Sequence, residues 1–191
     1  MTGRVSGKMA FVTGAAQGIG EAIAFKLAKE GAKVTVADIN EEGATAVSKK
    51  INDQFPGKAF SVALDVTSED QWKESLDRSE VSMGGLNILV NNAGISAGST
   101  IEETDYETFQ NVMKIDTDSV FLGSKYAIPI MKKYAPGSIV NTSSISGLIA
   151  GHNMVAYNTA KAGVWLMSKS IALHCARQGY QIRCNTIHPT F

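Results

Sequence analysis

Residues 13–20 read TGAAQGIG, and they stand between a short apolar run and a longer stretch in which apolar residues recur at helical spacing. Gly14 permits a tight turn, Gly18 lets the backbone approach a pyrophosphate, and Gly20 lets a helix pack closely on the preceding strand. The N-terminus of such a helix presents free N–H groups and a positive dipole to phosphates. Glycines also close ordinary strand-to-helix turns, so the stretch alone leaves two interpretations open, a dinucleotide site and a plain turn.

The rest of the chain alternates between short, β-rich apolar runs and longer segments of helical period. This alternation predicts repeated βαβ units and a mostly parallel sheet. The expected fold class is therefore α/β, a doubly wound parallel sheet in one domain over residues 1–191, because no internal linker or repeat interrupts the chain. The expected strands are Met9–Val12, Lys33–Asp38, Lys58–Asp65, Ile88–Val90, Ser138–Ser143 and Gln181–Ile187; the expected helices are Gly18–Glu30, Glu41–Gln54, one capped by Ser68, one from Thr104 or Asp105 to Tyr134 with a bend at Pro129, and Met154–Gln178.

Composition excludes several classes of partner. The chain has 191 residues, of which 44% are apolar and 19% charged, which fits one globular domain. Eighteen basic residues balance eighteen acidic ones, so no net field would hold the chain on nucleic acid or on an anionic membrane. No apolar run reaches the roughly 18 residues of a membrane helix, and we expect a soluble, cytoplasmic protein. The cysteines form no CxxC pair and the histidines no HExxH motif, so we expect no metal site and two buried thiols, Cys175 and Cys184.

Asp38 ends the second expected strand, at the usual distance from a glycine turn for an acid that binds ribose. Its carboxylate can accept hydrogen bonds from both ribose hydroxyls of an adenosine, and its charge repels a 2′-phosphate. The residue therefore favours NAD (NADH) over NADP as the cofactor. The alternative is a solvated acid that caps the helix beginning at Glu41.

Tyr157 and Lys161 lie four residues apart near the start of the last long helix, so their side chains share one face. A phenol titrates near pH ~10 in water, but a nearby ammonium favours the phenolate and makes the group usable as an acid or base. Ser144 follows the fifth expected strand, at the carboxyl edge where doubly wound sheets bind ligands, and its hydroxyl can hydrogen-bond a substrate carbonyl. Taken singly, these residues also fit a surface pair and a polar strand exit; together, beside a glycine turn, they favour proton transfer at a catalytic site.

The motifs TGAAQGIG, NNAG at Asn91–Gly94, Ser144 and YNTAK at Tyr157–Lys161 resemble, in order and spacing, the classical short-chain dehydrogenase/reductase (SDR) family over essentially the whole chain. The resemblance implies a Rossmann fold, a nicotinamide cofactor and reversible hydride transfer between nicotinamide and a secondary alcohol or ketone. It assigns the acid/base role to Tyr157, carbonyl stabilisation to Ser144, and the positioning of phenol and ribose to Lys161. It also implies a homodimer or homotetramer built on the two longest helices. The cofactor contacts expected from the motifs are Gly14, Gln17, Gly18, Ile19, Gly20, Asp38, Ile39, Asp65, Val66, Asn92, Ala93, Gly94, Tyr157, Lys161 and Pro189.

Two places depart from the family pattern. Asp116 stands where the family usually has the asparagine of its catalytic tetrad, which helps to hold a water molecule. If a main-chain carbonyl holds that water, an aspartate can take the place of the asparagine. Its carboxylate would nevertheless add a negative charge beside Lys161. Pro189-Thr190 replaces the common Pro-Gly, and the chain stops at Phe191 directly after a strand, so we expect a truncation that removes the substrate loop and the last strand. These departures keep a second hypothesis open, a cofactor-binding protein or fragment without catalytic activity.

Two segments are expected to line the substrate pocket, Ile95–Thr100 and Ser146–Met154. Their small and apolar residues favour a neutral substrate such as a cyclic or secondary alcohol. The leading hypothesis is therefore an NAD-dependent alcohol dehydrogenase or carbonyl reductase that acts on a small molecule.

Overall fold

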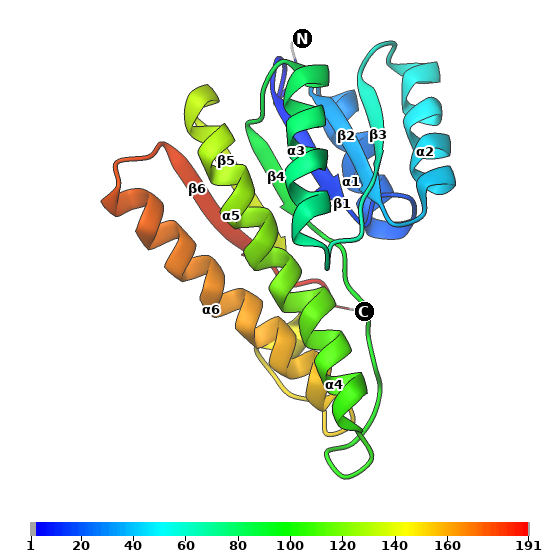
Figure 1. Cartoon of the computed structure of the whole chain (residues 1–191), viewed down its shortest axis with the longest axis vertical. Coiled ribbons are helices and arrows are strands. Elements are labelled where there is room, and N and C mark those ends of the chain that lie inside the picture. Colours follow the sequence, from blue (N-terminus) through cyan, green and yellow to red (C-terminus); the bar gives the residue numbers. More distant parts are fainter. Residues whose placement is uncertain (1–2, 191) are drawn as a thin grey trace.

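The computed structural model describes residues 3–190, and its centre is a sheet of six parallel strands (Figure 1). The strands are β1 (Met9–Thr13), β2 (Lys33–Asp38), β3 (Ala59–Ala63), β4 (Ile88–Asn91), β5 (Gly137–Thr142) and β6 (Ile182–Ile187). Their spatial order is β3-β2-β1-β4-β5-β6, so the direction of winding reverses between β1 and β4. A crevice for ligands is expected beyond the carboxyl ends of the strands at such a reversal. The predicted α/β class and doubly wound, Rossmann-type parallel sheet are confirmed.

Helices cover both faces of this sheet. The first two, α1 (Gly18–Lys29) and α2 (Glu41–Gln54), pack on one face and contribute to one buried apolar cluster. The other face carries α3 (Glu69–Met83), α5 (Ser119–Met131) and α6 (Val155–Arg177), which Figure 1 shows in front of the sheet. All four residues of β4 are buried, as expected for a strand with helices on both sides. Among residues 3–190, no helix is both long and apolar enough to cross a membrane.

The core also fixes the turn that follows β3. Trp72 of α3 is fully buried and packs against Phe11 of β1, with ring centroids 5.8 Å apart. Its indole N–H donates to the carbonyl of Val66, at 2.9 Å, so the polar atom of this large side chain is satisfied inside the core. This bond holds the turn that carries Asp65 and Val66 against α3. Cys175 and Cys184 are buried and unpaired, as the sequence predicted.

Side-chain caps define the starts of several helices. Ser68 accepts the N–H of Gln71 at the start of α3, as predicted. Asp105 accepts the N–H of Thr108 at the start of α4 (Tyr106–Met113), which settles the choice between Thr104 and Asp105. Asn40, and not Asp38, caps α2 by accepting the N–H of Gly43. The interpretation of Asp38 as the cap of that helix is therefore wrong.

The long helix expected from Thr104 or Asp105 to Tyr134 is interrupted at a different place. A π-helical turn, Lys114–Asp118, separates α4 from α5, and a short 3₁₀ turn, Lys132–Tyr134, ends the segment. Pro129 lies inside α5, so the irregularity is not at the proline as expected. A π-helical turn adds one residue to a helical turn, and such turns are frequent at functional sites. Here the turn contains Asp116, whose buried contacts are described next.

Candidate active site

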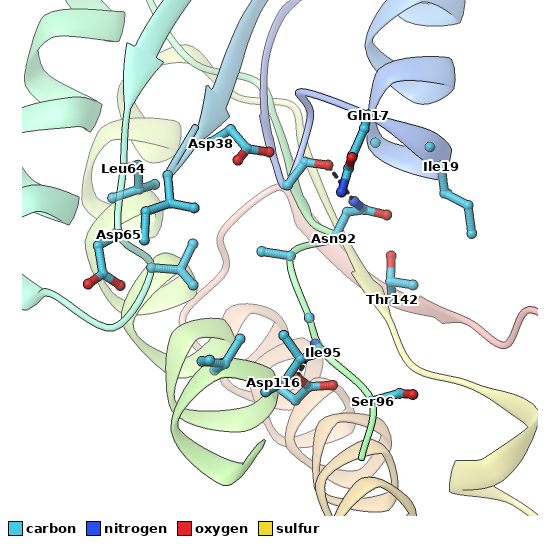
Figure 2. A pocket seen from close by; sticks show the side chains of 18 of the residues that line it. Gln17, Ile19, Asp38, Leu64, Asp65, Asn92, Ile95, Ser96, Asp116 and Thr142 are labelled. Carbon is cyan, nitrogen blue, oxygen red and sulfur yellow. Dashed lines mark hydrogen bonds between the residues drawn. The ribbon is translucent and has the colours of Figure 1, made fainter. Parts of the chain in front are cut away.

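A cleft of about 560 Å³ opens at the carboxyl ends of the strands, where the winding reverses (Figure 2). It brings together almost all residues predicted for the site. Ser144 and Pro189 are described by the structure but lie outside this lining. Ile95 and Ser96, at the start of the segment predicted to line the substrate pocket, belong to it, whereas no residue of the other predicted segment, Ser146–Met154, does. Leu64, Ile115 and Thr142 belong to it without having been predicted as site residues. The predicted residues that line it are Gly14, Gln17, Gly18, Ile19, Gly20, Asp38, Ile39, Asp65, Val66, Asn92, Ala93, Gly94, Asp116, Tyr157 and Lys161.

The glycine turn has the conformation that the motif requires. Gly14 has φ +61° and Gly18 has φ +58°, backbone conformations that other residues rarely adopt. No heavy atom lies within 4 Å of where a Cβ on Gly18 would stand, apart from its chain neighbours, so its backbone is accessible. A Cβ on Gly20 would collide with the main-chain oxygen of Gly14. The absence of a side chain at Gly20 therefore lets the helix lie close to the glycine turn that follows β1. The N-terminus of α1 therefore opens onto the cleft.

Hydrogen bonds join this turn to the NNAG segment after β4. The hydroxyl oxygen of Thr13 accepts the N–H groups of Asn92 and Ala93, both at 3.0 Å. The amide of Asn92 donates in return to the carbonyls of Thr13, at 3.0 Å, and Gly14, at 3.2 Å. Figure 2 shows Asn92 reaching across to the turn from the middle of the cleft. Two segments that are distant in sequence thus form one continuous wall.

Asp38 points into the cleft from the end of β2, on the side opposite Ile19 (Figure 2). One carboxylate oxygen accepts the N–H of Ala16 in the glycine turn, and the other accepts the N–H of Asn40, both at 2.9 Å. These two bonds orient the carboxylate and tie the end of β2 to the glycine turn. Asp65, in the turn that follows β3, is oriented by the N–H and hydroxyl of Thr67, which both donate to its Oδ1.

Lys161 and Asp116 form a buried ion pair at the inner end of the cleft. Lys161 Nζ lies 3.0 Å from Asp116 Oδ2, and the two residues are only 3% and 0% exposed. Nζ also donates to the carbonyl of Thr142, at 3.1 Å, and Asp116 Oδ1 accepts the N–H of Ile95, at 2.8 Å. A Cβ on Gly94 would stand 3.1 Å from both charged atoms, so the glycine leaves just enough room for the pair.

Burial raises the pKa of Asp116 above its ordinary value, and the positive charge of Lys161 together with the N–H of Ile95 opposes that rise. The carboxylate thus depends on the lysine for much of its stabilisation as an anion. Removing either partner would leave the other buried and without its counter-charge.

Tyr157 sits one helical turn before Lys161 on α6, on the same face, as the spacing predicted. The lysine ammonium lies 5.5 Å from the centroid of the tyrosine ring, a cation–π contact. The phenol lines the cleft and is half-buried, and the ammonium lies on the inner side of it.

Ser144 begins the turn that follows β5. Its hydroxyl oxygen accepts the N–H of Ser146, at 3.1 Å, which leaves the hydroxyl proton available to another acceptor. The neighbouring Ser143 donates to the carbonyl of Lys161, at 2.8 Å, and so anchors the turn to α6. The serine turn and the Tyr157–Lys161 helix are therefore directly connected, although Ser144 itself lies beside the cleft lining.

The three additional lining residues, Leu64, Ile115 and Thr142, carried no recognisable sequence signal. Thr142 acts through its main-chain carbonyl, which any residue type supplies. Leu64 and Ile115 border the predicted motifs and could have been included only by extending each motif by one residue.

A family model described as short chain dehydrogenase matches residues 8–191. Three curated relatives illustrate the range of similar proteins. An NADP-dependent (R)-specific alcohol dehydrogenase of Lentilactobacillus kefiri is 39% identical over 100% of this chain and 75% of its own length. A trans-4-hydroxycyclohexanecarboxylate dehydrogenase of Sinomonas cyclohexanicum is 40% identical over 97% of this chain and 73% of its own length. A cyclopentanol dehydrogenase of Comamonas testosteroni is 39% identical over 98% of this chain and 74% of its own length.

Proposed function

The chain belongs to the short-chain dehydrogenase/reductase family, and on that premise we propose that it transfers a hydride between NAD(H) and a neutral secondary alcohol or ketone. Its relatives are oxidoreductases named for alcohols and hydroxy compounds. The observation that carries the proposal is the buried Lys161 beneath Tyr157, in the same cleft as the glycine turn and Asp38. The proposed enzyme is an alcohol dehydrogenase that also acts as a carbonyl reductase.

The residues present fit a nicotinamide dinucleotide. The accessible backbone at Gly18 and the N-terminus of α1 suit the two phosphates, and Asp38 suits the adenosine ribose. Asp65 and Val66, together with the Asn92–Gly94 wall, would hold the adenine and the middle of the molecule. When bound, the nicotinamide supplies the site that accepts or gives the hydride.

The proposed preference for NAD over NADP rests on Asp38. Both carboxylate oxygens already accept main-chain N–H groups, so the side chain is held in one orientation. An anion there accepts bonds from ribose hydroxyls and repels a 2′-phosphate. One similar protein is NADP-dependent by name, so family membership leaves this preference open and the proposal depends on the residue itself.

Proton transfer is assigned to the hydroxyl of Tyr157. In ketone reduction, the phenol gives its proton to the carbonyl oxygen as the carbon becomes an alcohol; in oxidation, the phenolate takes the alcohol proton. Lys161 places its ammonium 5.5 Å from the centre of the tyrosine ring and is itself held by Asp116 and Thr142. The hydroxyl of Ser144 donates a hydrogen bond to the same substrate oxygen, without giving up its proton, and stabilises the negative charge that develops there.

We further propose that the protein is a homodimer or homotetramer. Phe121 on α5 and Leu166 and Leu173 on α6 are large apolar residues that stand more than half exposed. A second copy packed on these two helices would remove them from water. Light scattering after size-exclusion chromatography tests this, and a monomer at micromolar concentration would contradict it.

A cofactor-binding protein without turnover is the competing function. Asp116 favours it, because a buried carboxylate paired with Lys161 at 3.0 Å competes with any other partner of the ammonium. Purified protein, NADH and a panel of cyclic and acyclic ketones separate the two hypotheses. We expect NADH oxidation with part of the panel; NADH binding by fluorescence without oxidation of any of these ketones would support the competing function.

A further inference from the structure

The segment that follows β6 is bonded to the turn that carries Ser144. The two residues that flank Ser144 each donate a main-chain N–H to the carbonyl of a residue that flanks His188. The bonds run from Ser143 to Ile187, at 2.9 Å, and from Ile145 to Pro189, at 3.1 Å. His188 is thereby fixed beside Ser144, although 44 positions separate them in the sequence.

The imidazole of His188 bridges two oxygen atoms. Its Nδ1 lies 3.0 Å from the main-chain oxygen of Ser144, and its Nε2 lies 2.9 Å from the hydroxyl oxygen of Thr186. Because a carbonyl can only accept a hydrogen bond, Nδ1 must carry the proton, and in the neutral ring Nε2 accepts the proton of the threonine hydroxyl. The ring of Trp165 meets the imidazole at 83°, with centroids 6.2 Å apart. The ring is therefore held at both nitrogens and by an aromatic neighbour.

Trp165 lies on α6, the helix that also carries Tyr157 and Lys161. The imidazole thus stands between the Ser144 turn and that helix. The carbonyl of Ser144 also accepts the N–H of Gly147, at 2.9 Å, but Gly147 belongs to the same turn. His188 supplies the bond that ties this carbonyl to a different part of the chain.

The direction of the Ser144 hydroxyl depends on its backbone, which is extended, with φ −160° and ψ 162°. We propose that His188 is a positioning residue for Ser144: its Nδ1–H holds the serine carbonyl, and so sets the direction from which the hydroxyl meets the substrate carbonyl. This role rests on the proposed function, in which Ser144 stabilises the substrate oxygen. Misplacing such a group lowers the rate of the chemical step more than it lowers binding.

The first experiment compares His188→Leu with His188→Asn in the purified protein. Leucine keeps the approximate size and removes both ring nitrogens, whereas the asparagine amide can place an N–H near the position of Nδ1. We expect His188→Leu to lower kcat for ketone reduction about tenfold, the effect of losing one hydrogen bond of ordinary strength, with NADH affinity unchanged. His188→Asn should recover most of that loss. His174→Leu, on the exposed side of α6, is the matched control and should retain wild-type kcat.

The second experiment repeats His188→Leu in a Ser144→Ala background. If His188 acts through the serine hydroxyl, His188→Leu should cause no further loss once that hydroxyl is absent. An equal fold-loss in both backgrounds, or a parallel loss of NADH affinity, would show a merely structural role and overturn the proposal. Wild-type kcat in His188→Leu would overturn it as well.

A measurement on the wild-type protein needs neither turnover nor a stable variant. The ¹⁵N chemical shifts of the His188 ring distinguish the two neutral tautomers, and the geometry requires the proton on Nδ1. A ring protonated on Nε2 alone would overturn the proposed bond to Ser144. The Nδ1–H tautomer in a protein that turns over no ketone would instead contradict the proposed function, and with it a catalytic purpose for the bond.

Discussion

Asp116 and Lys161 form a buried ion pair, with 3.0 Å between Oδ2 and Nζ, directly behind the ring of Tyr157. The π-helical turn Lys114–Asp118 brings the carboxylate to this position, and the N–H of Ile95 fixes its other oxygen. The aspartate thus contacts the lysine through its side chain. In the sequence this residue was a departure from a family motif; in the structure it is the ion-pair partner of Lys161.

Replacing Asp116 with Asn should keep or raise turnover and shift the pH–rate profile. The substitution removes a titratable group, whose pKa is raised by burial, and its negative charge from a position 3.0 Å from the Lys161 ammonium, so it changes the charge beside the proton-transferring residue. We expect alcohol oxidation to reach its plateau at lower pH in Asp116→Asn. The check is kcat/KM measured against pH in both reaction directions; superimposable curves for the two proteins would show that the side chain does not communicate with the reaction.

The same substitution should change how stability depends on pH. Because the pKa of Asp116 is raised above 3.8 in the folded protein, the folded state holds this proton more tightly than the unfolded chain does. The free energy of unfolding contributed by Asp116 therefore falls as pH rises from 3.8 to the raised pKa, and it levels off above that value. Asp116→Asn lacks this titration, so its stability relative to wild type should rise with pH across that window, on top of a pH-independent cost from leaving Lys161 without its counter-charge. Urea denaturation of both proteins over a pH series measures the difference, and a difference independent of pH would contradict the assignment.

Replacing Asp38 with Ala should narrow the preference for NADH over NADPH. The change removes both the carboxylate that would accept the ribose hydroxyls and the charge that repels a 2′-phosphate, so NADH binding should weaken at least about tenfold while NADPH binding improves. Fluorescence titrations of both nucleotides provide the test. A wild-type protein that prefers NADPH would remove the role assigned to Asp38. Asp53→Ala, an exposed acid on α2, is the control that should leave both affinities unchanged.

Replacing Ser144 with Ala should lower kcat by a factor of about 10²–10³, as the loss of one donor to a developing oxyanion does, with little change in NADH affinity. Steady-state kinetics with the best ketone of the panel, together with NADH titration, separates these effects. Ser82→Ala, an exposed serine near the end of α3, is the matched control. Equal kinetics for Ser144→Ala and wild type would remove the serine from the mechanism.

The sequence predicted those parts of the site that depend on local pattern. Gly14 and Gly18 have the positive φ that favours glycine, and Gly20 leaves no room for a Cβ beside Gly14. The spacing of Tyr157 and Lys161 on one helix placed them on one face. What it missed depends on long-range contacts. The π-helical turn at Asp116 is associated with bonds to Lys161 and Ile95, whereas the proline at 129 was the only local signal for an irregularity. The His188–Ser144 bond likewise exists only because β6 lies beside β5.

The central claim, that the hydroxyl of Tyr157 transfers the proton during hydride transfer, is tested most directly by Tyr157→Phe. This variant removes one oxygen and keeps the ring that faces Lys161, and Tyr106→Phe, an exposed tyrosine on α4, is its matched control. The measurement is kcat for ketone reduction beside NADH affinity in the same preparations. We predict that Tyr157→Phe loses about 10²-fold or more in kcat while NADH affinity stays close to wild type and the control keeps full activity. A Tyr157→Phe protein that reduces ketones as fast as wild type would contradict the claim.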